Sequence, residues 1–553
     1  MRLQWKNTVA AATILIATSW AGSAYAETLN CADLTTHDFG IEGLVIASAS
    51  AEPVGETSPA AHCLVSGHVA ERNGADGNTY KISFELRLPD DWNGRFVHQF
   101  NGGNDGRVVP AMGPLLNADD SDNALSRKYA VVSSDAGHDG SAHPDAGFAG
   151  GTKFGFDPEA RSDYGYSAVI KLNPVATQIV EGYYGTEIAY SYGVGTSNGG
   201  RHGLVQATRS PEAFDGILAG YPGLNLPKAA VQHAWDIQSF KAVSDDVTQA
   251  FSPDDLKLVA DAVLQACDDL DGLADGIVAD SPSCQQTFDI SSLTCGEASN
   301  NCLTSAQVEA LRRIHAGPVN SAGEELYSDW AWDRGIEGRG WTAWKLNSGS
   351  ERMNNLPRIA TLGASSLAMV FSNPPQDVGG DPDSLVNYLL EFDFDTDVTI
   401  DASTAEFPES PMEFMTPTDV EDPEMADFRE AGGKMIVFHG MSDPVFSALD
   451  TIDWYEKLDA NNGGNAEDFV MFYTVPGMNH GFGGPATDKF AAFDALVDWV
   501  ENGKQPDYLV ATTTPDNPYL PELADATRKL CPYPAIARYR GGDEKDHDSF
   551  VCQ

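Results

Sequence analysis

Short apolar runs recur along the chain and end in glycine or polar residues, which is the pattern of buried strands. Six such runs cover residues 95–100, 129–132, 188–192, 214–219, 434–438 and 469–473. Near-continuous apolar runs of this length are typical of strands that are covered on both faces. Helix-like patterns lie between them, at residues 164–184, 200–210, 447–459 and 489–502. This alternation predicts the α/β class with a mostly parallel sheet.

The strand pattern stops between about residue 225 and residue 430. This long stretch carries four of the eight cysteines, an Asp-rich loop and several tryptophans (Trp235, Trp330, Trp332, Trp341 and Trp344). An insertion of this length between two strands of one sheet predicts a second domain that covers the site. We therefore expect a catalytic domain of residues 27–224 and 430–553, with a lid domain of residues 225–429.

The N-terminus has the pattern of a secretory signal. Arg2 and Lys6 precede an apolar run over residues 8–20, and Ala24-Tyr25-Ala26 forms a small-x-small cleavage site. A membrane anchor is the alternative, but the run is shorter than the ~20 residues that span a bilayer. We expect residues 1–26 to be a signal peptide, and the mature protein to be secreted or periplasmic with no membrane attachment.

The formal net charge of the chain is −47. So large a negative charge argues against nucleic acid and anionic membrane surfaces as partners. An acidic surface of this kind is compatible with a saline environment or with simple solubility, and it does not indicate a substrate.

The cysteine content predicts disulfides, because an even number of cysteines in an exported chain is typical of them. The sequence alone leaves 105 possible pairings of eight cysteines. Their order suggests that neighbours pair, as Cys31–Cys63, Cys267–Cys284, Cys295–Cys302 and Cys531–Cys552. No cysteine stands at a zinc-ligand spacing from histidines, so a zinc site is not expected.

The stretch Gly195-Thr196-Ser197-Asn198-Gly199 has the G-x-S-x-G pattern of a nucleophile elbow. It follows a predicted strand and precedes a predicted helix, as the elbow requires. A serine in this place lies at a helix N-terminus, where backbone N–H groups favour a developing oxyanion. The alternative is a glycine-rich turn without chemistry.

Two later strand ends supply the other members of a catalytic triad. Asp443 follows the predicted strand at 434–438, and His480 follows the one at 469–473. α/β-hydrolases place their triad in the chain order Ser, Asp or Glu, then His. We therefore predict the triad Ser197, Asp443 and His480. For the oxyanion hole we expect the backbone N–H groups of Asn198 and of Gly103, with Gly102 as an alternative to Gly103.

These residues, with their neighbours, resemble the tannase and feruloyl esterase family of secreted α/β-hydrolases. The resemblance is carried by Gly199-Gly200-Arg201-His202-Gly203-Leu204, by residues 209–220 and by Val475-Pro476-Gly477-Met478-Asn479-His480. It extends over nearly the whole mature chain. It implies an α/β-hydrolase fold with a large inserted lid domain and a serine carboxylic ester hydrolase that acts through an acyl-enzyme. The implied substrates are esters of small aromatic acids, of the feruloyl or galloyl type.

A second substrate class stays open. The family includes the hydrolase of mono(2-hydroxyethyl) terephthalate, and residues 442–448 resemble that branch. Terephthalate or similar phthalate half-esters are therefore the alternative substrates. An exported peptidase and a non-catalytic binding protein of the same fold are less favoured, because no anchor for a peptide terminus is found and all three triad residues are present.

The resemblance also implies a structural calcium ion in the lid. Its ligands fall on the side chains of Asp268, Asp271 and Asp275 and on the backbone carbonyls of Leu273 and Ile277. Independently, hard oxygen ligands in a glycine-containing loop suit calcium. The loop is not an EF-hand, since no glutamate stands at the twelfth position from Asp271. A solvated acidic turn is the alternative.

The chain departs from the family at two positions. Members usually carry a disulfide between the residue before the serine and the residue after the histidine, and here these are Thr196 and Gly481. The missing bridge performs no step of acyl transfer, so we expect it to affect stability rather than the reaction.

Several residues are candidates for the substrate pocket. We expect Phe446, three residues past the triad acid, to form part of its wall, and lid tryptophans either to line it or to pack in the lid core. Three lid arginines are candidate anchors for a carboxylate: Arg334, Arg339 and Arg352.

Overall fold

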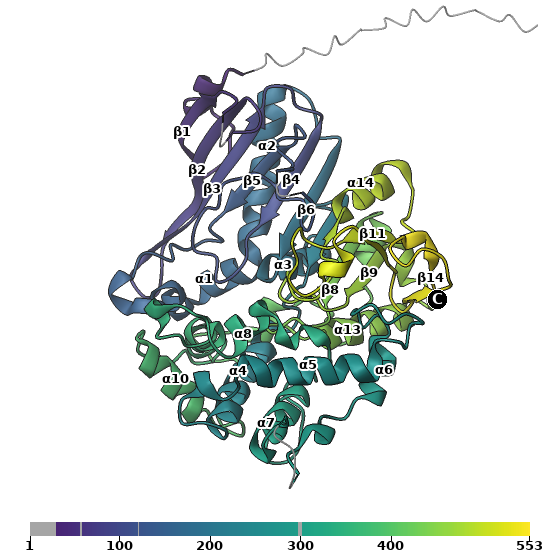
Figure 1. Ribbon diagram of the computed structural model, residues 1–553. Coiled ribbons are helices and arrows are strands. Elements are labelled where there is room, and N and C mark those ends of the chain that lie inside the picture. The colour runs from purple at the N-terminus through teal and green to yellow at the C-terminus, as the bar shows by residue number, and fades with distance from the viewer. Residues whose placement is uncertain (1–28, 56–57, 120, 297–300) are drawn as a thin grey trace, which may run out of the picture.

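The computed structural model describes residues 29–55, 58–119, 121–296 and 301–553 (Figure 1). The predicted signal peptide, residues 1–26, lies outside the described residues. Within the described part of the chain, no helix has both the length and the apolar character needed to cross a membrane.

A nine-stranded mixed sheet forms the centre of the fold, in the order β1-β2-β3-β5-β4-β6-β7-β8-β9. All neighbouring strands from β5 to β9 pair in parallel. These six strands contain the six apolar runs: β4 (Arg95–Phe100), β5 (Ala130–Ser134), β6 (Tyr190–Thr196), β7 (Gly216–Gly220), β8 (Lys434–Gly440) and β9 (Val470–Val475). The expected α/β class with a mostly parallel sheet is therefore confirmed.

Three antiparallel strands extend one edge of the sheet, and the apolar runs did not predict them. They are β1 (Val45–Glu52), β2 (His62–Asn73) and β3 (Thr79–Pro89). Buried and partly exposed residues alternate along much of β2 and β3. Antiparallel strands with one face in the core have this period of two and lack a continuous apolar run, which explains the omission.

Helices cover both faces of the sheet. α2 (Ala168–Tyr184), α3 (Asn198–Arg209) and α13 (Ala448–Asn461) lie on one face, and α14 (Ala492–Asn502) lies on the other. Leu218 of β7 lies in the core between the sheet and α14. Its neighbours Ile217 and Ala219 lie in the core between the sheet and α3. Successive strand residues point to opposite faces, so one short apolar strand supplies two cores.

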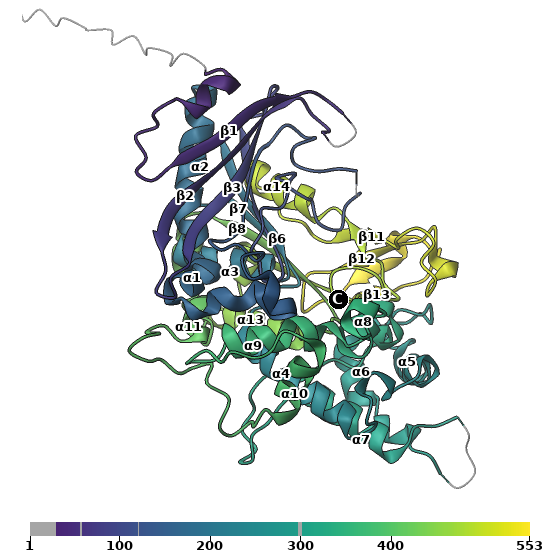
Figure 2. The ribbon, with the colours of Figure 1, turned by 90° about the vertical axis from the view of Figure 1, so that its left-hand side faces the viewer.

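In the described part of the segment between β7 and β8 the regular elements are helices, and their apolar side chains share one hydrophobic core with residues from outside the segment, such as Tyr80, Tyr164 and Phe446. Figures 1 and 2 show it as a layer of helices across one end of the sheet. Its helices are α4 (Leu226–Lys241), α5 (Pro253–Cys267), α6 (Ser281–Thr287), α7 (Ser305–His315), α8 (Arg339–Lys345), α9 (Ala364–Met369), α10 (Pro382–Glu391), α11 (Pro411–Met415) and α12 (Ala426–Glu430). The short α1 (Pro158–Ser162) precedes α2 on the sheet side.

Small sheets complete the C-terminal part. β10 (Lys489–Phe490), β11 (Leu509–Thr512) and β12 (Thr527–Leu530) form one, and β13 (Ala537–Tyr539) and β14 (Phe550–Cys552) form the other. β10 takes the start of the segment predicted as helix 489–502, so α14 begins only at Ala492.

Four disulfides join the cysteine pairs that chain order suggests. They are Cys31–Cys63, Cys267–Cys284, Cys295–Cys302 and Cys531–Cys552. The last of them fastens the C-terminal strand β14 to the end of β12.

Candidate active site

Ser197 occupies a sharp turn between β6 and α3. Its backbone has φ 61° and ψ −124°, which is unusual for a residue with a side chain. A Cβ at Gly195 would lie 2.6 Å from Gly199, and a Cβ at Gly199 would lie 2.5 Å from the Phe100 carbonyl oxygen. The flanking glycines are therefore required by space, and the turn presents the Ser197 hydroxyl at the end of the sheet.

The three residues predicted as a triad meet in one chain of hydrogen bonds. His480 Nε2 lies 2.9 Å from Ser197 Oγ, and His480 Nδ1 lies 2.8 Å from Asp443 Oδ2. Asp443 follows β8 and His480 follows β9, so the carboxyl ends of three parallel strands bring them together. This geometry is that of a nucleophile, a base and an orienting acid.

Asp443 has a second histidine beside it. His439 Nε2 lies 3.4 Å from Asp443 Oδ2, and His439 Nδ1 is 2.9 Å from Thr451 Oγ1. Burial alone would raise the pKa of the Asp443 carboxyl, but His480 and His439 hold it well below its usual range. His439 is near the end of β8, and the turn of the chain after this strand brings Asp443 back beside it.

Two loops lie beside the Ser197 hydroxyl where an oxyanion would form. Asn198 is the first residue of α3, so its backbone N–H has no acceptor within the helix. A Cβ at Gly102 would lie 3.9 Å from the Ser197 Cβ, which places the glycine loop against the nucleophile. Gly103 has φ 65°, and its carbonyl oxygen accepts a hydrogen bond from the Tyr164 hydroxyl at 3.2 Å.

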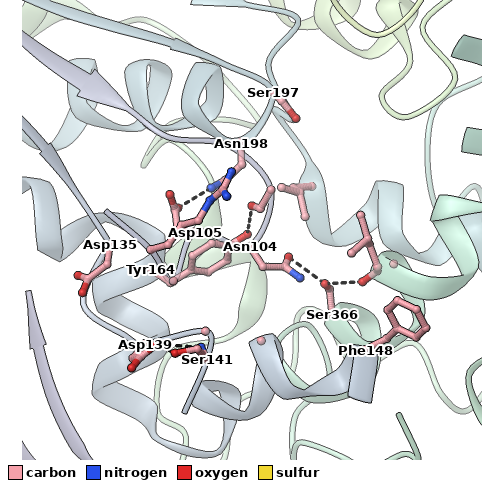
Figure 3. A pocket seen from close by; sticks show the side chains of 18 of the residues that line it. Asn104, Asp105, Asp135, Asp139, Ser141, Phe148, Tyr164, Ser197, Asn198 and Ser366 are labelled. Carbon is pink, nitrogen blue, oxygen red and sulfur yellow. Dashed lines mark hydrogen bonds between the residues drawn. The ribbon is translucent and has the colours of Figure 1, made fainter. Parts of the chain in front are cut away.

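A buried polar network joins these two loops (Figure 3). Asn198 donates from its side-chain amide to Asp105 Oδ2 at 2.8 Å and accepts from Arg201 Nε at 2.7 Å. Burial raises the pKa of Asp105 well above its usual value, although Arg201 opposes that shift. Burial also disfavours the charged form of Arg201 and lowers the pKa of its guanidinium to about 10. The network fixes the glycine loop relative to the start of α3.

A cavity of about 820 Å³ opens at Ser197. Figure 3 shows Ser197 at one end of the drawn residues, with Phe148 and Ser366 toward the other. The rings of Trp344 and Phe446 line the cavity and lie edge-on to His480, at centroid distances of 5.3 and 5.5 Å. Phe446 thus lies where the sequence placed it. Of the five lid tryptophans, only Trp344 lines this cavity.

None of the three candidate carboxylate anchors lines the cavity. Arg334 instead pairs with Glu337 and donates to the Gly276 carbonyl oxygen, so the guanidinium is already engaged in the lid. The cations that do line the cavity are Lys81 and Arg107, which lie outside the lid. The error arises because sequence does not show how the lid folds over the sheet.

The candidate calcium loop follows α5 and is clamped by the disulfide Cys267–Cys284. Asp268 Oδ1 accepts from the Gly276 N–H at 2.9 Å, and Asp275 Oδ2 pairs with Arg528 at 2.5 Å. Burial, together with the nearby Asp275 and Asp268, raises the pKa of Asp271 to about 7. The loop offers hard oxygen donors and crowded like charges, so the donor set fits calcium.

The carboxylates of this loop are not the tightest acidic cluster of the described residues. The potential ligand atoms of Asp546, His547 and Asp548 all lie within 4.8 Å of one another, and the loop at 268–277 does not form such a group. The ion pair of Asp275 with Arg528 holds one of the carboxylates toward the C-terminal strands.

Three further residues contact the site and are not predicted from the sequence: Tyr221, Asp105 and His439. Tyr221 lies edge-on to His480, with ring centroids 4.8 Å apart, and directly follows β7. Its position directly after a strand is a signal in the sequence, because Ser197, Asp443 and His480 also follow strands. Asp105 and His439 are brought to the site by the tertiary structure. Nothing in their local sequence distinguishes them from other polar residues.

The chain is similar in sequence to several known proteins. The family model for tannase and feruloyl esterase matches residues 63–553. The chain is 41% identical over 518 residues to mono(2-hydroxyethyl) terephthalate hydrolase of Piscinibacter sakaiensis, covering 89% of this chain and 84% of that protein. It is 31% identical over 495 residues to a probable feruloyl esterase of Arthroderma benhamiae, covering 85% and 82% respectively.

The fold is also found among solved structures. Feruloyl esterase B from Aspergillus oryzae superposes with a TM-score of 0.71 at 21% identity, covering 93% of this chain and 97% of that one. At that identity the likeness concerns the fold alone, while the family match rests on the sequence. The chain belongs to the tannase and feruloyl esterase family.

Proposed function

We propose that the chain is an exported serine carboxylic ester hydrolase that acts on esters of small aromatic acids. The observation that carries this proposal is the hydrogen-bonded chain Ser197–His480–Asp443 at the end of a cavity lined by Trp344 and Phe446. Aromatic side chains in the wall of a cavity are typical of sites for small aromatic ligands. Family membership supports the same reaction class.

In the proposed mechanism, His480 Nε2 takes the proton of Ser197 as Oγ attacks the ester carbonyl carbon. The oxyanion that forms accepts hydrogen bonds from the N–H groups of Asn198 and Gly103. His480 then gives the proton to the leaving alcohol, and an acyl-Ser197 ester remains. Water repeats the sequence, which releases the acid and restores Ser197.

The remaining contacts orient the His480 imidazole and the Asn198 side chain. Asp443 accepts from His480 Nδ1 and from the backbone N–H of Val445 at 2.7 Å, so it holds the imidazole in one tautomer. Asp105 and Arg201 hold Asn198 from both ends of its amide. A preorganised oxyanion hole needs such fixed supports, because its N–H groups must not reorient during the reaction.

A terephthalate or phthalate half-ester is the second candidate substrate. The relative named for mono(2-hydroxyethyl) terephthalate, at 41% identity, favours it. Lys81 and Arg107, which line the cavity, are the cations that a free carboxylate would approach.

The test is a side-by-side assay of methyl ferulate, methyl gallate and mono(2-hydroxyethyl) terephthalate, with a peptide anilide as the control for peptidase activity. Ser197→Ala should abolish turnover and leave the circular dichroism spectrum unchanged. Ser210→Ala, at the other end of α3, is the matched control and should retain turnover. Turnover by Ser197→Ala, or cleavage of the anilide alone, would overturn the proposal.

We also propose that the loop after α5 holds a structural calcium ion. The supporting observations are the three carboxylates of Asp268, Asp271 and Asp275 in one short loop and the disulfide that clamps this loop, and the family resemblance adds the carbonyls of Leu273 and Ile277. Bound calcium would neutralise the crowded carboxylates and add to the stability of the lid. It takes no part in the acyl transfer proposed above.

We also propose that the protein is exported from the cytoplasm after cleavage of a signal peptide. The N-terminal pattern of residues 1–26 and the four disulfides both suit an oxidising compartment outside the cytoplasm. Mass spectrometry of the secreted protein tests the cleavage site, which we place after Ala26.

A further inference from the structure

A buried histidine in the wall of the active-site cavity has no hydrogen-bond partner. His233 lies on α4, is 7% exposed and lines the same cavity as Ser197. Among the described residues, neither its Nδ1 nor its Nε2 has a partner. Leaving a buried polar group unpaired is unfavourable, so the ring calls for a partner that the chain itself does not supply.

The helix that carries His233 starts beside the nucleophile. The backbone N–H of Gly223 donates to the Ser197 carbonyl oxygen at 3.3 Å, and α4 begins three residues later. Leu226, Ala230 and His233 share one face of α4, and all three line the cavity. At 1.5 Å per residue, His233 lies roughly 10 Å along the helix from Leu226. An acyl group bound to Ser197 and extended along this face of α4 would point its far end toward His233.

The backbone of Gly363, another residue of the cavity wall, lies directly against this imidazole. A Cβ at Gly363 would lie 2.1 Å from His233 Nδ1, so the ring packs against the bare backbone of Gly363. Rotation about the Cβ–Cγ bond exchanges the nitrogen and carbon positions of an imidazole. The edge that borders the cavity can therefore present a nitrogen to a ligand.

The chemistry of the ring narrows the choice of ligand group. Burial, with the nearby Lys345, lowers the pKa of His233 to about 3, so the ring is neutral at ordinary pH. Lys345 itself is paired with Asp236 at 2.5 Å and is not free to bind an anion. A neutral imidazole offers one donor and one acceptor. A hydroxyl matches this pair, whereas a carboxylate only accepts and would be buried there without a free cation.

We propose that His233 is a specificity-determining residue that hydrogen-bonds a hydroxyl group at the far end of the aromatic acid. This inference rests on the proposed esterase function, and it identifies the substituent of the aromatic acid that the site recognises. A site that pairs with a substrate hydroxyl discriminates strongly against the analogue that lacks it, because its own polar group is then left unpaired.

The experiment compares methyl 4-hydroxycinnamate with methyl cinnamate, and uses p-nitrophenyl acetate as an ester too short to reach His233. The wild-type enzyme should show a ratio of kcat/KM between the two cinnamates on the order of tenfold to a hundredfold. His233→Leu should bring that ratio close to one and leave the acetate rate within about twofold. His233→Gln, which keeps a donor and an acceptor, should recover part of the ratio.

Two further variants serve as a control and as an independent check. His315→Leu is the matched control, because His315 is another buried lid histidine but does not line this cavity; it should keep the wild-type ratio. Gly363→Ala should lower the ratio without removing the imidazole, because its new Cβ displaces the ring. If thermal unfolding shows that His233→Leu does not fold, the kcat/KM ratio of Gly363→Ala tests the role of His233.

The outcomes separate the two proposals. A wild-type ratio near one, or an unchanged ratio in both His233→Leu and Gly363→Ala, overturns the role of His233 while the esterase stands. If the wild-type enzyme cleaves p-nitrophenyl acetate but neither cinnamate nor any other aromatic acid ester, the proposed substrate class fails instead.

Discussion

The ring of Tyr221 fills the space that a side chain at Gly481 would need. A Cβ at Gly481 would lie 2.2 Å from Tyr221 Cζ, and Gly481 has φ 86°, where only glycine is unstrained. The same ring lies edge-on to His480. In this chain an aromatic contact therefore occupies the position where the family resemblance implies a disulfide between residues 196 and 481.

Restoring the bridge should fail while Tyr221 is present. The double substitution Thr196→Cys with Gly481→Cys should lower the free energy of unfolding by about 1–3 kcal/mol, as overpacking in a filled core does. Adding Tyr221→Ala should remove the clash and permit the disulfide. Thermal unfolding, with thiol titration to count the bridges, measures both. A double variant that forms the bridge and unfolds at a higher temperature than wild type contradicts this account.

Acidification should abolish activity through a single protonation. Protonated His480 cannot accept the Ser197 proton, so kcat/KM falls as the pH is lowered. Asp443 does not add a second step in this range, because its pKa is held well below the usual value and it stays ionised. The acid limb of a plot of log kcat/KM against pH should therefore have a slope of about one. A slope of two would show that Asp443 titrates in the same range.

Removing calcium should destabilise the protein. A ligand at a hundredfold excess over its Kd stabilises the folded state by about 2.7 kcal/mol, so EGTA should lower Tm and added calcium should restore it. Asp271→Asn should remove this response. Asp269→Asn is the matched control, since Asp269 lies in the same loop outside the proposed ligand set, and it should keep the response. If neither EGTA nor Asp271→Asn shifts Tm, the site is a solvated acidic turn.

Shortening Phe446 should weaken the binding of aromatic acids. Its ring lines the cavity and packs against Gly223, which leaves no room for a side chain there. Phe446→Ala should lower kcat/KM for methyl cinnamate roughly tenfold, mainly through KM, because apolar contact with the ring is lost. Hydrolysis of p-nitrophenyl acetate should change much less. An equal loss on both esters would mean that Phe446 acts on His480 rather than on the substrate.

Local pattern was enough for the central part of the fold. The apolar runs predicted β4 to β9 because strands buried on both faces must be apolar throughout. The strands β1 to β3 were missed because one exposed face breaks the run. The glycines around Ser197 and the order of Ser197, Asp443 and His480 also identified the nucleophile elbow and its partners, since a parallel sheet brings its carboxyl strand ends to one edge.

The sequence by itself thus determined the six central strands β4 to β9 and the three residues Ser197, Asp443 and His480, and the order of the cysteines suggested the four disulfide pairs. Only the tertiary structure decided what surrounds them. It placed Trp344 and His233 in the wall of the cavity, paired Arg334 with Glu337, and put Tyr221 against Gly481. The physical reason is that periodicity records only whether a residue is buried. Which residue it is buried against depends on how the helices between β7 and β8 pack over the sheet, and no local pattern encodes that packing.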